Sequence, residues 1–446
     1  MGSCLPVVGN EFDVLKIRPT NQTHDSIYKQ TTADLVGTIR GAYIQLYCTS
    51  SGTTQQFYDM SEKIIRNSPA IDSFGRLSPK ALLFAPTYEK TFKVRKTALL
   101  KGIGNSQRLY EIATNNTKEL LAQYGPENRS DSSGDLKKLL KTWTRNTSCE
   151  FIWGKMGLTR TVRVINSNHK VVDVPLMTAL DEIESELRYY SYRFWNRIYS
   201  PLVALPITKE ARRLNHNIKV FQSEFMAMLV NAEPGSAAYA IAAEYKAHGI
   251  SLDVTRDDLT IITSAGLGNV RAAIMSTIFH LYREQNVTWK QQLLQEIDPI
   301  LSNPNHSYND ITQARILDAI LSESMRLEPP GSLMDNLVAT DFTMNVGKDK
   351  TYRILKGTRL APNVHMLHLK DPLWIKHEGM SSLTTFDPSR FIEHGDSYAG
   401  SNFYMPFGKG SRGCPGRWQA KLMVKTFLAL FVKSNPNCQI LLPEGQ

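Results

Sequence analysis

One cysteine near the end of the chain lies among glycines, and its surroundings suit a metal-binding thiolate. We call residues 407–416 the cysteine loop, and a helix is predicted over residues 415–431, directly after Cys414. The dipole and the unpaired N–H groups of a helix N-terminus stabilise a thiolate. Arg412 can bind an anion two residues before the sulfur, and Phe407 can shield the sulfur from water.

The glycines of the cysteine loop indicate the shape of the ligand. Gly408, Gly410 and Gly413 permit tight turns and leave backbone exposed to a flat molecule. Gly416 removes a side chain where such a molecule would press against the loop. The loop is therefore predicted to hold a planar cofactor through the sulfur of Cys414.

The strongest helical segment in the sequence is a long helix over residues 253–285. Its apolar residues follow helical spacing, and its length is roughly 45 Å at 1.5 Å per residue. Ala265, Gly266 and Gly268 lie in its middle, and a mid-helix glycine costs about 1 kcal/mol relative to alanine. Either another element approaches the backbone closely there, or the helix is distorted. We expect a local opening at Gly266 and Gly268.

The other elements are mostly helical. We expect helices over 57–67, 105–124, 176–230 with an apolar break near residue 200, and 311–327, and short strands within 333–362. The break is either a helix–turn–helix packed on the core or a mobile apolar lid. No internal repeat or low-complexity linker is found, and residues 1–446 are expected to form a single domain that is mainly α with a minor β region.

Composition excludes several classes of protein. Of the 446 residues, 42% are hydrophobic and 21% charged, as in an ordinary globular protein. Five widely spaced cysteines without a CxxC pair argue against a disulfide framework and a structural zinc site. The net charge of +10 is spread along the chain without a long basic tract, so we expect a solvated basic surface and no nucleic-acid partner.

The cysteine loop resembles the haem-binding signature of the cytochrome P450 family. The signature Phe-x-x-Gly-x-Arg-x-Cys-x-Gly is matched at Phe407, Gly410, Arg412, Cys414 and Gly416. The resemblance implies a P450-like fold, with haem b between the long central helix and the cysteine-loop helix. It also implies that Cys414 is the axial ligand of the iron.

Further segments extend this resemblance over nearly the whole chain. Glu323 and Arg326 resemble the Glu-x-x-Arg pair of the family, and Phe386-Asp-Pro-Ser-Arg-Phe391 resembles the segment that supplies a second arginine, here Arg390. The resemblance implies that these three charged residues form a structural network that supports the cysteine loop.

Haem propionates need cations, and the resemblance implies several candidates. Arg412 is one of them. Where the family has Trp-x-x-x-Arg, this chain has Phe92 followed by Arg95 and Lys96, and either cation can serve. A further family arginine is replaced by Asn336. The expected cofactor-binding residues are Cys414, Arg412, Phe407, Gly408, Gly416, Lys96 and Arg95.

The long helix departs from the family in the residues expected to act catalytically. The common pattern Ala/Gly-Gly-x-Asp/Glu-Thr is replaced by Ala265-Gly-Leu-Gly268-Asn269, so Gly268 stands for the acid and Asn269 for the alcohol. An asparagine can hydrogen-bond but cannot relay a proton as an alcohol does. This helix is similar to those of the prostacyclin synthase and cholesterol 7α-hydroxylase branches, an isomerase and a monooxygenase.

Three functions follow from the resemblance. The first is a monooxygenase that oxidises a hydrophobic terpenoid, sterol, lipid or alkaloid-like molecule of secondary metabolism with dioxygen and reductase-supplied electrons. The alternatives are a redox-neutral isomerase or dehydratase and, with less support, a haem-binding sensor. The expected substrate pocket is apolar and is formed by Leu82, Phe84, Ile262, Leu267, Leu333, Met334 and Leu337.

The resemblance also implies partners and a location. Basic residues are expected to cluster on the cysteine side of the haem and to dock the acidic NADPH–cytochrome P450 reductase: Lys93, Lys96, Lys409, Arg417, Lys421 and Lys425. Residues 5–9 are similar to the hinge that follows the membrane anchor of the family. We therefore expect an anchor upstream in the native protein, a place on the cytoplasmic face of the endoplasmic reticulum membrane, and a C-terminal hairpin that is missing or truncated.

Overall fold

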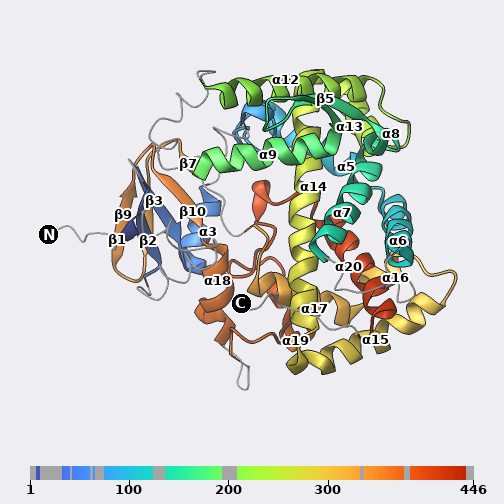
Figure 1. The fold of residues 1–446 in the computed structure, drawn as a ribbon. Coiled ribbons are helices and arrows are strands. Elements are labelled where there is room, and N and C mark those ends of the chain that lie inside the picture. The colour runs from blue at the N-terminus through green and yellow to red at the C-terminus, as the bar shows by residue number, and fades with distance from the viewer. Residues whose placement is uncertain are drawn as a thin grey trace.

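A helical body with a small β-sheet on one side forms the structure, a computed structural model (Figure 1). The structure describes residues 7–10, 33–40, 43–60, 64–65, 75–123, 136–192, 208–331, 336–375 and 382–437. The mainly α fold with a minor β region that the sequence predicts is confirmed.

The helices of the described residues are as follows: α3 (Ser51–Asp59), α5 (Lys90–Gly102), α6 (Ser106–Gln123), α7 (Leu136–Trp153), α8 (Met156–Thr159), α9 (Leu176–Tyr192), α12 (Lys209–Val230), α13 (Ala237–Ala247), α14 (Leu252–Leu281), α15 (Val287–Ser302), α16 (Tyr308–Gln313), α17 (Arg315–Leu327), α18 (Val364–Lys370), α19 (Ser389–Tyr398) and α20 (Arg417–Ser434). Three 3₁₀ turns accompany them: η3 (Glu284–Asn286), η4 (Pro372–Ile375) and η5 (Gly410–Arg412).

The strands are β1 (Val7–Asn10), β2 (Leu35–Arg40), β3 (Tyr43–Cys48), β4 (Ile64–Ile65), β5 (Thr161–Ile165), β6 (Val171–Pro175), β7 (Asn336–Val338), β8 (Phe342–Val346), β9 (Lys350–Ile354) and β10 (Arg359–Pro362). Six of them form a mixed sheet in the order β1-β2-β3-β10-β7-β4, and β5-β6 and β8-β9 are separate hairpins. Strand β10 pairs in parallel with β3 and antiparallel with β7, so the C-terminal half of the chain returns to a sheet begun by the N-terminal half.

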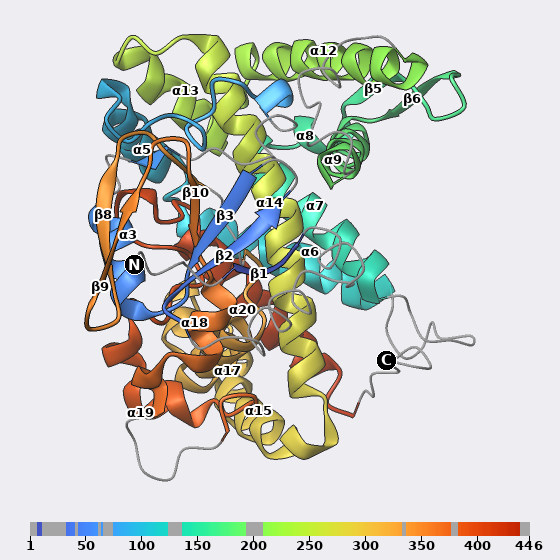
Figure 2. The ribbon, with the colours of Figure 1, turned by 90° about the vertical axis from the view of Figure 1, so that its left-hand side faces the viewer.

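The long helix α14 runs through the helical body, with α9 and α12 across one end and α15 near the other (Figure 1). Seen from the side of the sheet, the strands lie in front of α14 (Figure 2). Hydrogen bonds fix α14 to its neighbours: Trp153 Nε1 donates to Thr263 Oγ1 at 2.9 Å, and the Ser276 and Ser324 hydroxyls are 3.0 Å apart.

The expected opening of α14 is not found, because the helix is continuous from Leu252 to Leu281. Instead, another helix approaches the backbone of α14 closely at Gly266. Ser148 Oγ donates to the Gly266 carbonyl at 3.2 Å, and a Cβ on Gly266 would lie 2.9 Å from that hydroxyl. Around Gly268, in contrast, no atom would lie within 4 Å of an added Cβ.

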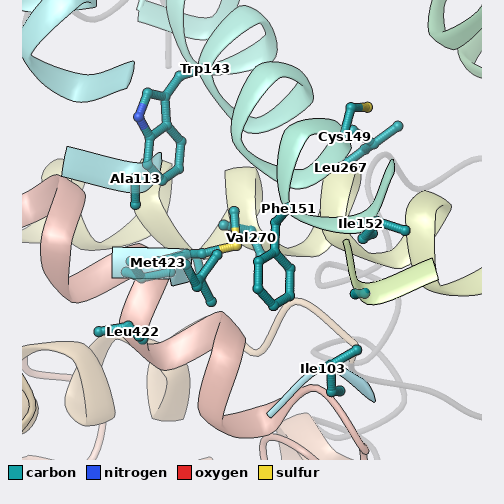
Figure 3. Packing of buried hydrophobic residues seen from close by; sticks show 14 of the residues in the cluster. Ile103, Ala113, Trp143, Cys149, Phe151, Ile152, Leu267, Val270, Leu422 and Met423 are labelled. Atoms are coloured by element: carbon teal, nitrogen blue, oxygen red, sulfur yellow. The ribbon is translucent and has the colours of Figure 1, made fainter. Parts of the chain in front are cut away.

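The main core joins α14 to α5, α6, α7, α12, α17 and α20. Figure 3 shows part of it, where Phe151 of α7, Val270 of α14 and Met423 of α20 pack together. A second apolar cluster includes Leu46 and Leu360 of the sheet together with Phe342 and Ile354 of the β8-β9 hairpin.

Local structure differs from the sequence-based expectation in two places. The helix expected over 57–67 is instead α3, which Ser50 caps through the Thr53 N–H, followed by β4, which pairs with β7. The helix expected over 311–327 is divided at Ala314 into α16 and α17. The apolar break near residue 200 lies outside the described residues.

Within the described part of the chain, no helix combines the length and apolarity needed to cross a membrane.

Candidate functional site

The cysteine loop has a backbone that requires glycine at two positions. Gly408 and Gly410 adopt φ values of 67° and 64°, in the region that strains other residues. The Cys414 N–H donates to the Phe407 carbonyl at 2.8 Å, which closes the loop, and α20 begins at Arg417. The side chain of Cys414 is exposed. An exposed sulfur is thus presented just before a helix N-terminus.

Arg412 joins the cysteine loop to the segment that precedes α5. Its guanidinium donates to the carbonyl of Leu83 at 3.3 Å and to the carbonyl of Ala85. It also lies over the Phe92 ring, 4.7 Å from the ring centroid. Phe92, which stands where the family has tryptophan, is therefore a cation–π partner of the loop arginine.

The two propionate candidates on α5, Arg95 and Lys96, have different surroundings. Lys96 Nζ donates to the Ser411 carbonyl at 2.7 Å and so lies beside the cysteine loop. Arg95 is 3% exposed, and its guanidinium donates to Asp258 of α14 at 3.1 Å and 2.9 Å. The propionate role expected for Arg95 conflicts with this buried pairing, and Lys96 remains the candidate on α5.

Asp258 is a buried centre that the sequence reasoning missed. Besides Arg95, it accepts hydrogen bonds from the Leu82 N–H and from the Tyr245 hydroxyl, the latter at 2.6 Å. Burial raises the pKa of the Asp258 carboxyl, and Arg95 opposes that rise. An acid inside an apolar helical pattern was the available signal, but its partners lie far away in the sequence.

One face of α14 is exposed in the middle of the helix. Ala265, Asn269 and Ala272 are exposed there, and Gly268 beside them is half-buried. Residues at i, i+4 and i+7 share one side of a helix, so these side chains form a single stripe. Ala265, Gly268 and Asn269 therefore lie on one side of α14, which residues that act on the same substrate require.

Leu267 was expected in the substrate pocket, but it lies on the opposite side of α14. It is 5% exposed and packs in the main core with Cys149 of α7 (Figure 3). The reason is helical phase, because two residues along a helix correspond to a rotation of about 200°.

The other expected pocket residues have mixed positions. Leu82 is buried in the main core, Ile262 is partly buried against that core, and Phe84 and Leu337 are half-buried. Leu333 and Met334 lie outside the described residues.

The structure brings Glu323, Arg326 and Arg390 together as a buried ionic cluster. Arg326 Nε is 2.7 Å and Arg390 Nε is 3.6 Å from the Glu323 carboxylate, and each of these side chains is 0% exposed. The Asp387 N–H also donates to this carboxylate at 2.9 Å. Burial raises the pKa of Glu323, and Arg326 opposes the rise. Breaking such a pair typically costs 3–5 kcal/mol.

Asn336 occupies a buried position on β7. It pairs with Leu360 of β10 across the sheet, and its side-chain amide lies 3.5 Å from the Leu360 carbonyl. The family arginine that it replaces therefore has no charged equivalent at this position.

Two of the expected docking lysines are engaged in an internal ion pair. Lys425 is 3% exposed and lies 2.7 Å from Asp318 of α17, and Lys421 lies 3.0 Å from the same carboxylate. Burial lowers the pKa of Lys425, and Asp318 opposes that change. Lys93 and Arg417 are exposed, as is Trp418 beside Arg417. Burial therefore removes Lys425 from a docking face, whereas Lys421, whose side chain is 25% exposed, is engaged with Asp318.

The residues present fit a planar cofactor that is bound through sulfur. A side chain at position 416 would place its Cβ 4.0 Å from Cys414 Sγ, in van der Waals contact with the sulfur. Glycine at this position therefore leaves the sulfur accessible. The exposed stripe of Ala265 and Asn269 in the longest helix supplies a mostly small, apolar surface for a large apolar group. The cysteine loop, Lys96 and Arg412 supply the thiol and the cations that haem requires.

This combination of fold and site defines a haem-thiolate protein. A family model described as Cytochrome P450 matches residues 4–435. Because that match covers nearly the whole chain, the chain belongs to the cytochrome P450 family. Its cofactor is haem with iron and an axial cysteine, and it is a cytochrome P450 monooxygenase.

The relatives found in the comparison share little of their sequence with this chain. A 3-beta-hydroxylase of Tanacetum parthenium is 24% identical over 445 residues, which are 96% of this chain and 83% of the relative. A self-sufficient cytochrome P450 monooxygenase of Exserohilum turcicum is 27% identical over 207 residues, 44% of this chain and 18% of the relative. A nicotine N-demethylase of Nicotiana tomentosiformis is 39% identical over 109 residues, 24% of this chain and 19% of the relative. The last two matches thus span less than a fifth of those relatives.

Proposed function

We propose that this protein hydroxylates or otherwise oxygenates a hydrophobic small molecule of the terpenoid, sterol, lipid or alkaloid-like class. The overall reaction consumes one substrate, one dioxygen, one NADPH and one proton, and it yields oxygenated product, water and NADP⁺. The observation that carries the proposal is the exposed Cys414 in a loop whose geometry depends on Gly408 and Gly410. The relatives named as a hydroxylase and as a monooxygenase support the same reaction class.

In this proposal, residues 1–446 act as one catalytic domain. Cys414 ligates the iron, Phe407, Gly408 and Gly416 shape the cofactor side of the loop, and Lys96 and Arg412 neutralise the propionates. When bound, haem supplies the activation of dioxygen with electrons from a redox partner. The Glu323–Arg326–Arg390 cluster holds the elements behind the loop and takes no part in the chemistry.

We propose that Asn269 orients substrate or water on the open face of α14. Its amide is both a hydrogen-bond donor and an acceptor but has no hydroxyl through which a proton could be relayed. Gly268 and Ala265 beside it leave space for the substrate or for ordered water. The protons consumed in the reaction then come from water or from a substrate hydroxyl.

The proposed electron donor is the NADPH–cytochrome P450 reductase, docked on a face that includes Lys93 and Arg417. Both cations are exposed, and exposed charges steer an acidic partner mainly through its association rate. The similarity of residues 5–9 to a hinge after a membrane anchor supports a place on the cytoplasmic face of the endoplasmic reticulum.

The replacement of the usual acid and alcohol by Gly268 and Asn269 favours a second candidate, a redox-neutral isomerisation or dehydration. One experiment separates the two functions. A panel of lipophilic terpenoids, sterols, fatty acids and alkaloids is incubated with NADPH and reductase in air, and in parallel without reductant under anaerobic conditions. We expect product only where both NADPH and dioxygen are present. Product in the anaerobic arm would overturn the oxygenation proposed for this substrate class in favour of rearrangement.

A further inference from the structure

A buried histidine connects the Glu323 cluster to the start of the cysteine loop. His368 of α18 is 0% exposed. Its Nδ1 lies 3.2 Å from the carbonyl of Arg326, and the Arg326 guanidinium donates to the His368 carbonyl at 3.0 Å. Two hydrogen bonds therefore join His368 and Arg326, one to the backbone carbonyl of each residue.

The other ring nitrogen of His368 faces the cysteine loop. The N–H of Met405 donates to His368 Nε2 at 2.9 Å. A carbonyl can only accept, so Nδ1 carries the proton, and a backbone N–H can only donate, so Nε2 carries the lone pair. The contacts thus select one neutral tautomer. Burial lowers the pKa of His368 to about 3, which keeps the ring neutral at physiological pH.

Backbone hydrogen bonds extend this connection from Met405 to Cys414. The Gly408 N–H donates to the Met405 carbonyl at 3.0 Å, and the Cys414 N–H donates to the Phe407 carbonyl at 2.8 Å. Met405 itself is buried in a small cluster with Leu367 of α18. A displacement of the Met405 amide would therefore reach the turn that presents the sulfur.

We propose that His368 is a positioning residue that holds the cysteine loop in the arrangement in which Cys414 stays bound to the iron. The inference rests on the proposed ligation by Cys414. The Glu323 cluster does not contact Met405 in these hydrogen bonds. His368 contacts both Arg326 and Met405, so it links the position of the cluster to that of the cysteine loop.

Three substitutions test this role. In His368→Gln, the side-chain oxygen can take the place of Nε2 and accept the Met405 N–H. In His368→Asn, the amide can take the place of Nδ1 and reach Arg326, but it is too short for Met405. His368→Phe keeps the ring and makes neither hydrogen bond.

The control is Tyr404→Phe. The Tyr404 hydroxyl donates to the Ser322 carbonyl at 3.1 Å, so it anchors the same segment to α17 one residue before Met405. This variant removes a comparable anchor and leaves the Met405 N–H bound to His368.

The measurement uses haem-loaded full-length protein, reduced and bound to carbon monoxide, with haem content determined separately. The readouts are the fraction that has the long-wavelength Soret band of thiolate ligation and the rate at which that band is lost. Leaving a buried N–H without an acceptor typically costs enough free energy for about a tenfold effect. We expect about tenfold faster loss in His368→Phe and His368→Asn, and rates near the wild type in His368→Gln and Tyr404→Phe.

Equal rates for His368→Gln and His368→Asn would overturn the inference, as would an equal loss in Tyr404→Phe. Retention of the wild-type band and rate in His368→Phe would overturn it as well. A wild type that never shows the long-wavelength band contradicts the ligation by Cys414 itself, so the two failures are distinguishable.

Discussion

Asn269 stands where the family pattern has an alcohol, and its position gives that departure a physical meaning. It lies on the exposed stripe of α14, beside Gly268, where an added Cβ would meet no atom within 4 Å. A polar amide next to such open space can bind water or a polar group of the substrate. The stripe therefore has one hydrogen-bonding group among small residues.

We expect Asn269→Ala to raise the fraction of NADPH that is lost to hydrogen peroxide by a few fold, because bound water or substrate loses its partner. Haem content should stay at the wild-type level. Peroxide release and product are measured together against NADPH consumption. Asn269→Thr, which restores an alcohol, should couple at least as well as Asn269→Ala, and poorer coupling in Asn269→Thr would contradict the assigned role.

Two buried histidines make the stability of the fold depend on pH. Burial lowers the pKa of His280 to about 4 and that of His368 to about 3, from 6.5. Below pH 6.5 the unfolded chain binds protons that the folded protein excludes, so the free energy of unfolding falls as the pH falls. Between pH 7 and pH 5 each histidine accounts for about 2 kcal/mol of this loss.

The contribution of His280 is measurable by chemical unfolding at both pH values. His280 stacks on Phe386, with ring centroids 5.2 Å apart, so His280→Phe preserves the packing of the ring. We expect the difference in unfolding free energy between pH 7 and pH 5 to shrink by about 2 kcal/mol in this variant. An unchanged difference would show that the folded protein protonates His280 as readily as the unfolded chain does.

At the scale of elements, α14 owes its position to close packing on α7 and to the exposure of the opposite stripe. Gly266 faces Ser148 of α7 with no room for a side chain, whereas Gly268 faces open space. Replacing either glycine by alanine brings the same gain in helix propensity. Any difference between the two substitutions in the free energy of unfolding should therefore come from the surroundings of each glycine.

We expect Gly268→Ala to raise the free energy of unfolding by up to about 1 kcal/mol, the usual gain in helix propensity. Gly266→Ala should lower it by about 1–3 kcal/mol, because the new Cβ would lie 2.9 Å from Ser148 Oγ. Ser148→Ala in the Gly266→Ala background should recover part of that loss. Denaturant unfolding of the apo and haem-bound forms measures each value, and equal effects at both glycines would contradict the packing described.

The sequence predicted the elements whose signals are local. The cysteine loop is contiguous, so its glycines, Arg412 and Cys414 could be identified directly, and the apolar spacing of α14 predicted its bounds within a few residues. Partners that are distant in the sequence could be predicted only where a family motif marks each of them, as for Glu323 and Arg390. Arg95 pairs with Asp258, which lies 163 residues further on, and Lys425 pairs with Asp318, and no local pattern shows either. The prediction for Leu267 was wrong because a match to a family pocket segment does not show which side of the helix faces the core.

At the scale of the whole molecule, the charge of +10 is only partly available to a partner. Lys421 and Lys425 neutralise Asp318, and together they hold the pKa of that carboxyl below its usual range although burial pushes it up. Of the other candidates on the cysteine side, Lys93 and Arg417 are exposed, whereas Lys96 and Lys409 are half-buried and donate to backbone carbonyls. Exposed charges act over about 10 Å at 0.1 M salt.

We expect the double substitution Lys93→Glu with Arg417→Glu to lower reductase-supported turnover several-fold at low salt, with the difference fading at high salt. Turnover supported by peroxide should be unchanged. Lys421→Met is the control, because it weakens the internal pair with Asp318 and should lower stability without altering the salt dependence. Equal losses in the reductase and peroxide assays would indicate damage to the haem site instead of weakened docking.

Ligation of the haem iron by Cys414 is the proposal on which the reaction and the positioning role of His368 both depend. The most direct test is the absorption spectrum of the reduced, carbon-monoxide-bound protein, recorded for the wild type and for Cys414→Ala. We expect the long-wavelength Soret band of thiolate ligation in the wild type and its complete loss in Cys414→Ala. A wild-type spectrum of the ordinary histidine-ligated kind, or a long-wavelength band that survives in Cys414→Ala, would contradict the assignment of Cys414 as the axial ligand.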